Sequence, residues 1–266
     1  MKKRITSVLL ALLMALALLP ATAWAEDTTW STDIKLDGDM VLTGTVTISG
    51  AVTLSGNGTI TRGSGCTDAM ILVPSGAKLT IEGSVTLDGT PSSGTASNAA
   101  AIQVDEGGTV IMNGGTISSC RADDDGGAVF IKQSGSFELN GGVIQNCSAG
   151  ANGGAVNIYE DGHFTMTGGT IKSCEVDLGG LGMAGYGSNN KAVVTMTGGT
   201  FEDCGAYPYS FDEFTVTFDS DGGSAVTAQK VLNSPAIKPA DPTKNGYLFA
   251  GWYLGDTQYT FDTKIT

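Results

Sequence analysis

The stretch "MTGGTIKSC" at residues 166–174 returns almost unchanged as "MTGGTFEDC" at residues 196–204. Two earlier versions are "MNGGTISSC" at residues 112–120 and "LNGGVIQNC" at residues 139–147. The cysteines that end the four phrases are separated by 27, 27 and 30 residues. A fixed period of about 20 to 50 residues indicates a repeat architecture, in which each unit packs against its neighbours in the chain.

Each repeat contains three short runs in which apolar and polar residues alternate, separated by glycine-rich corners. In the unit that starts at Gly126 the runs are "GGAVFIKQ", "SGSFELN" and "GGVIQNC". Val129 and Ile131 share one parity in the first run. Phe137 and Leu139 share one parity in the second run. This alternation predicts β-strands that turn one face inward.

Three strands per repeat predict a right-handed parallel β-helix of about six coils between Thr32 and Tyr207. Neighbouring coils should lie about 4.8 Å apart, so equivalent side chains stack in columns inside the cylinder. The glycine pair of each phrase fits a corner that needs positive φ or a tight bend. In the last repeat the first run is replaced by "GGLGMAGYGSNN". The column that tests this fold consists of Met112, Leu139, Met166 and Met196.

Two roles are open for the cysteines that end the phrases. Stacked one coil apart, their Cα atoms would lie close enough for disulfides, but parallel side-chain directions suit the disulfide dihedral poorly. We therefore favour a buried column of reduced thiols that act as small apolar residues. A zinc site is not expected, because one thiolate per coil gives a line of ligands and not a tetrahedron. Cys66 lies outside this column and makes the total five.

Residues 1–25 have the pattern of a signal peptide. Basic "MKKR" precedes the apolar run "ITSVLLALLMALALLP", and "ATAWA" ends in an Ala-x-Ala site. The apolar run is too short to span a bilayer comfortably, and no second one follows, so we expect no transmembrane span in the mature chain. Cleavage after Ala25 would place the protein outside the cell or in the cell envelope.

Composition and charge exclude some classes of partner. The chain has 39 glycines and only 15% charged residues, as a β-rich protein with many turns does. Its formal net charge is −13, and loss of the three basic residues in the first segment would make it −16. Since no basic patch is present, we do not expect nucleic acid as a partner.

The glycine-rich phrases resemble the Gly-Gly-Thr-Ile-Ser coils of bacterial surface proteins in the pectin-lyase-like superfamily of right-handed parallel β-helices. The resemblance covers residues 32–207, and we assign residues 26–209 to this domain. It is specific for the fold and says little about function, because such repeats reflect turns and core packing.

The chain changes character after residue 209, where the period ends and prolines become frequent. The segments "VTFDSDGG", "KPADPTKNGYLFAGWY" and "FDTKIT" resemble the Listeria–Bacteroides repeat, also called the internalin B-repeat. The resemblance implies a small β-grasp-like module, at residues 210–266, of the kind found on exported bacterial surface proteins. Family members usually finish with a further strand that ends in "KW". We therefore expect this module to be incomplete and further modules to follow it.

The outward-facing positions of the first run are the candidate ligand-binding residues. They form two columns with a 27-residue spacing, and they mix amide, aromatic and charged side chains that suit hydrogen bonding and stacking with a glycan. The alternative is a solvated face with one Asp–Lys contact worth about 0–1 kcal/mol. The columns are Gln103, Phe130 and Asn157, followed by Asp105, Lys132 and Tyr159.

A set of catalytic residues is harder to find. Polysaccharide lyases of the resembled superfamily need calcium-binding carboxylates and a basic residue, and "RADDDGG" at residues 121–127 offers three carboxylates beside an arginine. Asp105 and Asp161 are candidates for the two carboxylates that a glycoside hydrolase uses. We favour the alternative that the acidic segment is a solvated turn. We also favour a structural role for His163 over a catalytic one. Trp252 and Tyr253 are interpreted as core or edge aromatics, with sugar stacking as the other option.

These observations favour an exported cell-surface protein with a non-catalytic role in adhesion, glycan contact or spacing. The alternative is a carbohydrate-active enzyme, a lyase or a glycosidase, that works on the outer face of the β-helix. No catalytic residue, metal ligand or cofactor is assigned. The expected partners are glycans or a host or cell-wall surface.

Overall fold

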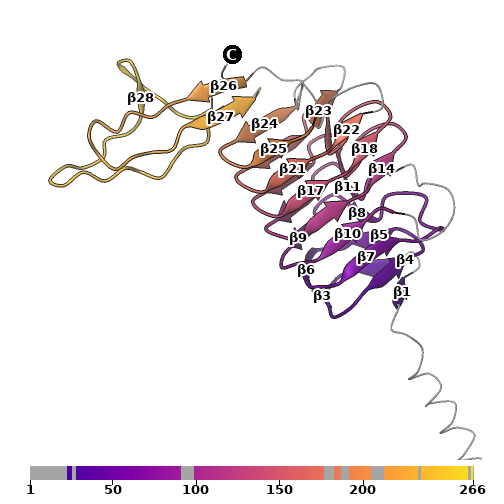
Figure 1. Ribbon diagram of the computed structural model, residues 1–266. Coiled ribbons are helices and arrows are strands. Elements are labelled where there is room, and N and C mark those ends of the chain that lie inside the picture. Colours follow the sequence, from indigo (N-terminus) through magenta and orange to yellow (C-terminus); the bar gives the residue numbers. More distant parts are fainter. Residues whose placement is uncertain are drawn as a thin grey trace, which may run out of the picture.

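The computed structural model describes residues 23–25, 28–90, 99–176, 183–186, 192–204, 213–232, 235–262 and 265. Within these ranges every regular element is a β-strand, and no helix is long and apolar enough to cross a membrane. The predicted signal peptide falls almost wholly outside them. The strands wind into a parallel β-solenoid, followed by a small β module at the C-terminal end (Figure 1). The predicted all-β fold class, a parallel β-helix followed by a small β module, is confirmed.

Three parallel sheets form the walls of the solenoid, and each coil contributes one strand to each wall. Sheet A contains β1 (Ala23–Ala25), β4 (Met40–Leu42), β7 (Thr59–Arg62), β10 (Thr86–Asp88), β13 (Thr116–Ser118), β17 (Val143–Gln145), β21 (Thr170–Lys172) and β25 (Thr200–Glu202). Sheet B contains β2 (Thr28–Trp30), β5 (Val46–Ile48), β8 (Ile71–Val73), β11 (Ile102–Val104), β15 (Val129–Ile131), β19 (Val156–Tyr159) and β23 (Met183–Tyr186). The solenoid part of sheet C contains β3 (Ile34–Leu36), β6 (Ala51–Gly56), β9 (Lys78–Ile81), β12 (Thr109–Met112), β16 (Ser136–Leu139), β20 (His163–Met166) and β24 (Val193–Met196).

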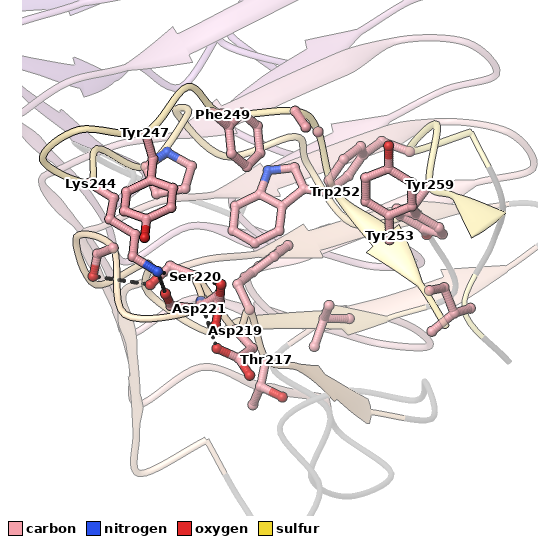
Figure 2. A pocket seen from close by; sticks show the side chains of 18 of the residues that line it. Thr217, Asp219, Ser220, Asp221, Lys244, Tyr247, Phe249, Trp252, Tyr253 and Tyr259 are labelled. Carbon is pink, nitrogen blue, oxygen red and sulfur yellow. Dashed lines mark hydrogen bonds and ion pairs between the residues drawn. The ribbon is translucent and has the colours of Figure 1, made fainter. Parts of the chain in front are cut away.

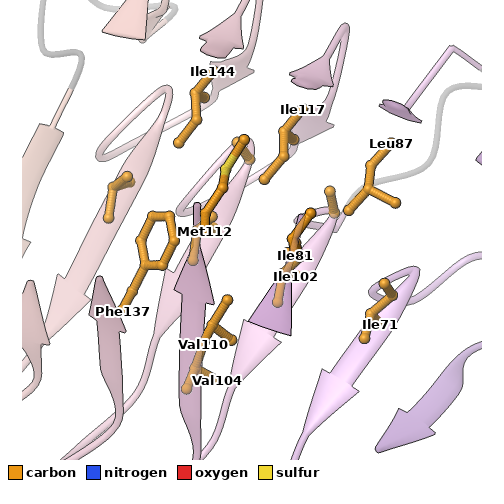
Figure 3. Packing of buried hydrophobic residues seen from close by; sticks show 14 of the residues in the cluster. Ile71, Ile81, Leu87, Ile102, Val104, Val110, Met112, Ile117, Phe137 and Ile144 are labelled. Carbon is orange, nitrogen blue, oxygen red and sulfur yellow. The ribbon is translucent and has the colours of Figure 1, made fainter. Parts of the chain in front are cut away.

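The strand register places equivalent residues of successive coils directly beside one another. In sheet C, Met112 pairs with Leu139, and Met166 pairs with both Leu139 and Met196. All four side chains are buried, so the predicted column is confirmed. Figure 3 shows the same stacking for residues of several coils inside the cylinder.

The buried columns account for the stability of the solenoid. One coil exposes its apolar residues on both sides, and only the coils before and after it can cover them. Phe137 and Phe164 illustrate this, because both are wholly buried and their ring centroids lie 5.5 Å apart. Each such side chain contributes about 1.5–3 kcal/mol on burial, which opposes the entropy lost by ordering the chain.

The corners use two kinds of left-handed residue. As predicted, the second glycine of each pair has positive φ, for example +86° at Gly142. A Cβ atom there would lie 2.6 Å from the carbonyl oxygen of Gly115 on the preceding coil, so only glycine fits without displacement. The residue before each phrase cysteine is also left-handed, which the sequence analysis did not predict. These residues are Ser119, Asn146, Ser173 and Asp203.

A fourth, narrow sheet follows three of the phrase cysteines. It was not predicted, because its strands have only two residues and no alternation can be recognised over that length. One residue of each strand is nevertheless buried. Its strands are β14 (Arg121–Ala122), β18 (Ser148–Ala149) and β22 (Glu175–Val176).

The C-terminal module joins the solenoid through sheet C. Strand β27 (Gln229–Leu232) pairs antiparallel with β24, the last solenoid strand of this sheet, and β26 (Glu213–Val216) pairs antiparallel with β27. Val231 is wholly buried at this junction. The two strands therefore cover one edge of the solenoid, which would otherwise present unpaired backbone groups. A separate two-stranded sheet, β28 (Tyr253–Leu254) and β29 (Thr257–Gln258), lies farther out in the module (Figure 1).

Candidate functional site

The outer face of sheet B carries the predicted ligand columns. Gln103 of β11 pairs with Phe130 of β15, which pairs with Asn157 of β19, so the first column is in register. Gln103 and Phe130 are half-buried. The same column continues toward the N-terminus through Leu72 and Thr47.

A polar groove of about 490 Å³ lies at the N-terminal end of this face. Its walls combine hydroxyl, amide and carboxylate groups with two apolar side chains, and the polar groups can both donate and accept hydrogen bonds. Such a lining suits a polyol better than a wholly apolar ligand. The groove is lined by Thr29, Thr45, Thr47, Asp68, Ala69, Leu72 and Gln103.

Two of the predicted charged residues hold the amide of Gln103 in place. Its Nε2 donates to Oδ1 of Asp105 at 2.8 Å, and Nζ of Lys132 lies 3.2 Å from the same oxygen. Both charged side chains are partly exposed, so the ion pair contributes little to stability. Its effect is to turn the carboxylate toward Gln103 and so to fix the rotamer of a groove residue.

Arg62 links the loop that carries the groove residue Asp68 to the segment before β11, and the sequence analysis did not single it out. Its side chain is 1% exposed, and it donates to the carbonyl oxygens of Cys66 and Asp68 on one side. On the other side it donates at 2.9 Å to the carbonyl oxygens of Ala99 and Ala100, shortly before β11. Burial lowers the pKa of Arg62. A lone arginine in "TITRGSGC", among threonine, glycine and apolar residues, is the signal that could have found it.

The expectation that Asn157 is exposed is wrong. Its side chain is wholly buried, and neither amide atom has a hydrogen-bond partner. The sequence analysis treated the next run, "GGLGMAGYGSNN", as a replaced strand. The structure instead continues sheet B there, with Ala184 of β23 paired to Asn157. Tyr159 at the end of the second column is half-buried.

The carboxylates considered for catalysis do not meet within the described ranges. Asp161 accepts hydrogen bonds from the backbone and hydroxyl of Ser134, whereas Asp105 is engaged with Gln103 and Lys132. In the acidic turn, Asp125 accepts from the Asn152 amide one coil later at 2.8 Å.

The remaining candidates for catalysis and metal binding are also dispersed. His163 is exposed on β20. No group of three His, Cys, Asp or Glu residues suited to a metal ion occurs in the part of the chain that the structure describes.

The phrase cysteines form a buried column of thiols. Each Sγ donates to the carbonyl oxygen two residues earlier, for example Cys120 to Ser118 at 3.1 Å and Cys147 to Gln145 at 3.2 Å. The left-handed residue between them makes this short contact possible. Burial raises the pKa of Cys147 well above its usual range, which keeps this thiol protonated and poorly reactive at neutral pH.

The C-terminal module contains a second cavity, of about 540 Å³, with aromatic walls (Figure 2). Trp252 is one of the residues that line it, and its ring centroid lies 5.1 Å from that of Phe218 and 5.2 Å from that of Phe249. Trp252 is 8% exposed, as the core interpretation predicted, whereas Tyr253 is 54% exposed in the edge strand β28. Sequence reasoning identified these aromatics but not the open space between them, because a cavity depends on how separate segments meet.

Comparison with known proteins bears on this module. Residues 214–266 match the Listeria-Bacteroides repeat domain. Internalin H from Listeria monocytogenes serovar 1/2a is 41% identical over 59 residues, which is 21% of this chain and 10% of that protein. The chain therefore spans about a tenth of the relative it matches. No solved structure matches the chain.

Proposed function

We propose that this chain is an exported surface protein whose solenoid contacts glycans without transforming them. The match to the Listeria-Bacteroides repeat domain and the local similarity to an internalin support a surface or adhesion role. The assignment of residues 1–25 to a signal peptide, residues 26–209 to the β-helix and residues 210–266 to the repeat module belongs to this proposal.

The proposal that the solenoid binds glycans is based on the polar groove on sheet B. It offers the hydroxyls of Thr29 and Thr47 and the oriented amide of Gln103 on strands of sheet B, and the carboxylate of Asp68 on the loop between β7 and β8. Phe130 lies next to Gln103 in the same column and provides a ring face for a sugar farther along. Binding residues on regular strands are held more firmly than residues on loops, which favours recognition of an extended chain.

A glycan array and a glycan-release assay test this proposal together. We expect the mature chain to retain neutral or hydroxyl-rich glycans and to release no unsaturated or reducing sugar from them. Gln103→Ala should weaken retention about five- to tenfold, since one or two hydrogen bonds are lost. Gln133→Ala removes an exposed amide outside the groove and serves as the matched control.

Two results would contradict the proposal. If the Gln103→Ala and Gln133→Ala proteins retain glycans equally well, the groove is not the glycan-binding site. Sugar release that disappears in Asp105→Asn or Lys132→Ala proteins would establish the enzymatic alternative. Export is tested separately by mass spectrometry of secreted protein, which should begin at Glu26.

A further inference from the structure

The polar groove on sheet B runs across the coils of the solenoid. Four of its lining residues come from four successive strands of this sheet and are paired in register, so they form one column along the solenoid axis. They are Thr29, Thr47, Leu72 and Gln103. Phe130 continues the column on the next strand. Since neighbouring coils lie about 4.8 Å apart, a ligand that follows the whole column is extended over about 19 Å.

Polar and apolar side chains alternate along the column from Thr47 to Phe130. Thr47 and Gln103 can form hydrogen bonds, whereas Leu72 and Phe130 present apolar surface. All four residues are half-buried, so each keeps part of its surface for a ligand. The pattern repeats every two coils, or about every 10 Å. A ligand that fits it throughout must also repeat after two of its units.

An extended chain of β-1,4-linked pyranoses has this repeat. Each sugar advances by nearly the spacing between coils and is turned over relative to the sugar before it, so every second sugar presents the same face and the same edge. The apolar C–H groups of the ring faces suit Leu72 and Phe130, and the hydroxyls at the edges suit Thr47 and Gln103. Chains with α-1,4 or β-1,3 linkages curl, and they leave a straight column after a few sugars.

The charges around the groove favour a neutral chain. The exposed carboxylate of Asp68 lines the groove. Lys132 meets, at 3.2 Å, the same carboxylate of Asp105 that holds the amide of Gln103. A chain of uronic acids would bring further negative charge to a protein whose formal net charge is −13. A glycan without carboxylates therefore fits the groove better than an acidic one.

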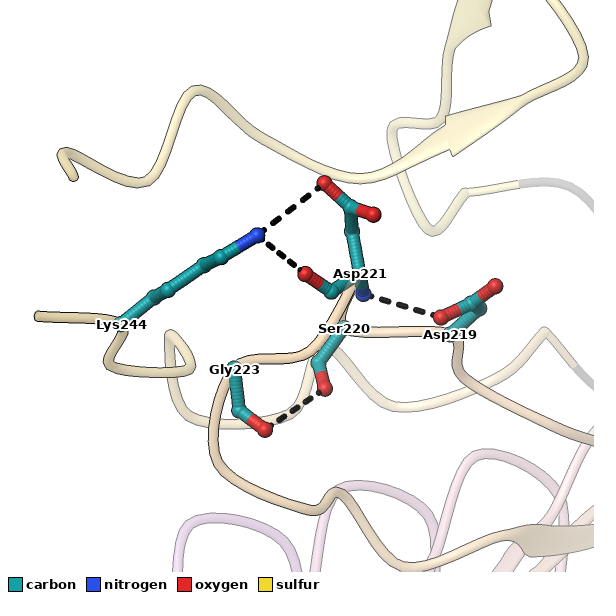
Figure 4. A network of polar contacts seen from close by, with 5 residues as sticks. All are labelled: Asp219, Ser220, Asp221, Gly223 and Lys244. Carbon is teal, nitrogen blue, oxygen red and sulfur yellow. Dashed lines mark hydrogen bonds and ion pairs between the residues drawn. The ribbon is translucent and has the colours of Figure 1, made fainter.

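The polar turn of the C-terminal module is less suited to a glycan, because its groups bond to one another (Figure 4). Nζ of Lys244 donates to the backbone and carboxylate oxygens of Asp221, and the N–H of Asp221 donates to the carboxylate of Asp219. In the amide of Gln103 it is Nε2 that is engaged, by Asp105. The carbonyl oxygen of Gln103 can therefore accept a hydrogen bond from a sugar hydroxyl.

We propose that this column binds a neutral β-1,4-linked glycan that lies along the solenoid axis with one sugar over each coil. Leu72 and Phe130 contact the ring faces of alternate sugars, and Thr47 and Gln103 form hydrogen bonds with the sugars between them. This inference rests on the proposed function, which it deepens by naming the linkage, the charge and the length of the glycan.

The column also sets the length of the bound chain. The position after Phe130 is Asn157, which is wholly buried and offers no surface to a sugar. The affinity of cello-oligosaccharides should therefore increase with chain length up to about five sugars, one for each residue from Thr29 to Phe130. Longer chains should bind little more tightly.

Three glucose hexasaccharides that differ only in linkage test the proposal by isothermal titration calorimetry. We expect the protein to bind cellohexaose, which is β-1,4-linked, at least about tenfold more tightly than maltohexaose (α-1,4) or laminarihexaose (β-1,3), because the curled chains lose several contacts. Equal affinities would overturn the inferred linkage. Tighter binding of a galacturonic acid hexasaccharide than of cellohexaose would overturn the inferred neutrality.

Phe130→Ala tests the register of one sugar per coil. Cellohexaose should bind about fivefold more weakly, since one ring face loses its apolar contact. The length at which affinity stops rising should also fall by about one sugar, and a merely structural role of Phe130 would not produce this change. Phe130→Tyr keeps the ring and should bind as the original chain does. Unchanged length dependence in the Phe130→Ala protein would contradict the register.

Ile111→Ala is the matched control for Phe130→Ala. It removes a half-buried apolar side chain from β12, on the outer face of sheet C, and should change neither the affinity nor the length dependence. If it weakens cellohexaose binding as much as Phe130→Ala does, the effect of Phe130 is not local to the column and the proposal is wrong.

The outcomes separate this inference from the proposed function. If the glycan array shows retention that depends on Gln103, but cellohexaose is not the tightest of the three hexasaccharides, the groove binds glycans and the inferred linkage is wrong. If no glycan is retained on the array and none binds in the calorimeter, the proposed function and this inference are both wrong.

Discussion

The solenoid and the C-terminal module use similar apolar side chains but cover them to different extents. Phe137 and Leu139 of β16 are wholly buried between the strands of neighbouring coils. In the module Leu248 is 96% exposed and Tyr247 is 70% exposed. The difference does not come from hydrophobicity, since both regions are rich in apolar residues.

Repetition explains the contrast. In the solenoid each inward side chain has an equivalent on the coils before and after it, so the sequence of one coil also specifies what covers the next. The module occurs once in this chain and closes its core around Trp252 with rings from separate segments. A region of the first kind covers its apolar side chains uniformly, whereas a region of the second kind leaves some of them exposed.

The largest expected effect comes from placing the same charge in each region. Ile144→Asp puts a carboxylate into the dry interior of the solenoid, where Ile144 is wholly buried between Ile117 and Ile171. We expect a loss of at least about 4 kcal/mol in the free energy of unfolding. Leu248→Asp should change it by less than about 0.5 kcal/mol. Urea unfolding followed by far-UV circular dichroism measures both, and similar losses would refute the contrast.

The same contrast separates what the sequence predicts from what it does not. The columns through Met112 and Ile144 follow from alternation and period alone, because strand parity decides which side chains point inward. Burial of Asn157 could not be predicted, since the following run shows no alternation and the structure nevertheless continues the sheet there. Arg62 and the aromatic cavity also escaped prediction. Both depend on segments that are distant in sequence, and no period relates those segments.

The next largest destabilisation is expected at the junction between the solenoid and the C-terminal module. Val231→Asp places a charge at a wholly buried position of β27, between its partners on β24 and β26. We expect the two module strands to separate from β24 at a cost of about 3 kcal/mol, and the uncovered solenoid edge to promote association between chains. Hydrogen exchange in β24 and light scattering report these changes. Thr227→Asp, at an exposed position before β27, is the control and should leave both unchanged.

A smaller effect tests the close approach of coils at the glycine corners. Gly142→Ala combines positive φ with a Cβ atom 2.6 Å from the Gly115 oxygen, so we expect about 2 kcal/mol of destabilisation. Gly76→Ala has a similar φ of +74° but nothing within 4 Å of its Cβ, and should cost about 1 kcal/mol. The two thermal unfolding transitions therefore measure the steric contribution by difference. Equal shifts would mean that the coils can separate locally without cost.

The smallest effect concerns the thiol column, which belongs to the solenoid alone because residues 213–266 contain no cysteine. Burial raises the pKa of Cys147 and of Cys204. Each folded thiol therefore holds its proton more tightly than the unfolded thiol, whose pKa is about 8.5. The stability that depends on the protonated thiols is complete below that pH. Above it the free energy of unfolding should fall by about 1.4 kcal/mol per pH unit for each such thiol, until the folded pKa is reached.

Cys147→Ala isolates one thiol of the column. Its free energy of unfolding should decline less steeply than that of the original chain between pH 9 and pH 10, by up to about 1.4 kcal/mol per pH unit. Below pH 8 the two proteins should differ by a constant amount, which reports the lost packing of the sulfur and not its ionisation. Parallel declines above pH 9 would show that the Cys147 thiol ionises as easily inside the solenoid as in water, contrary to its burial between coils.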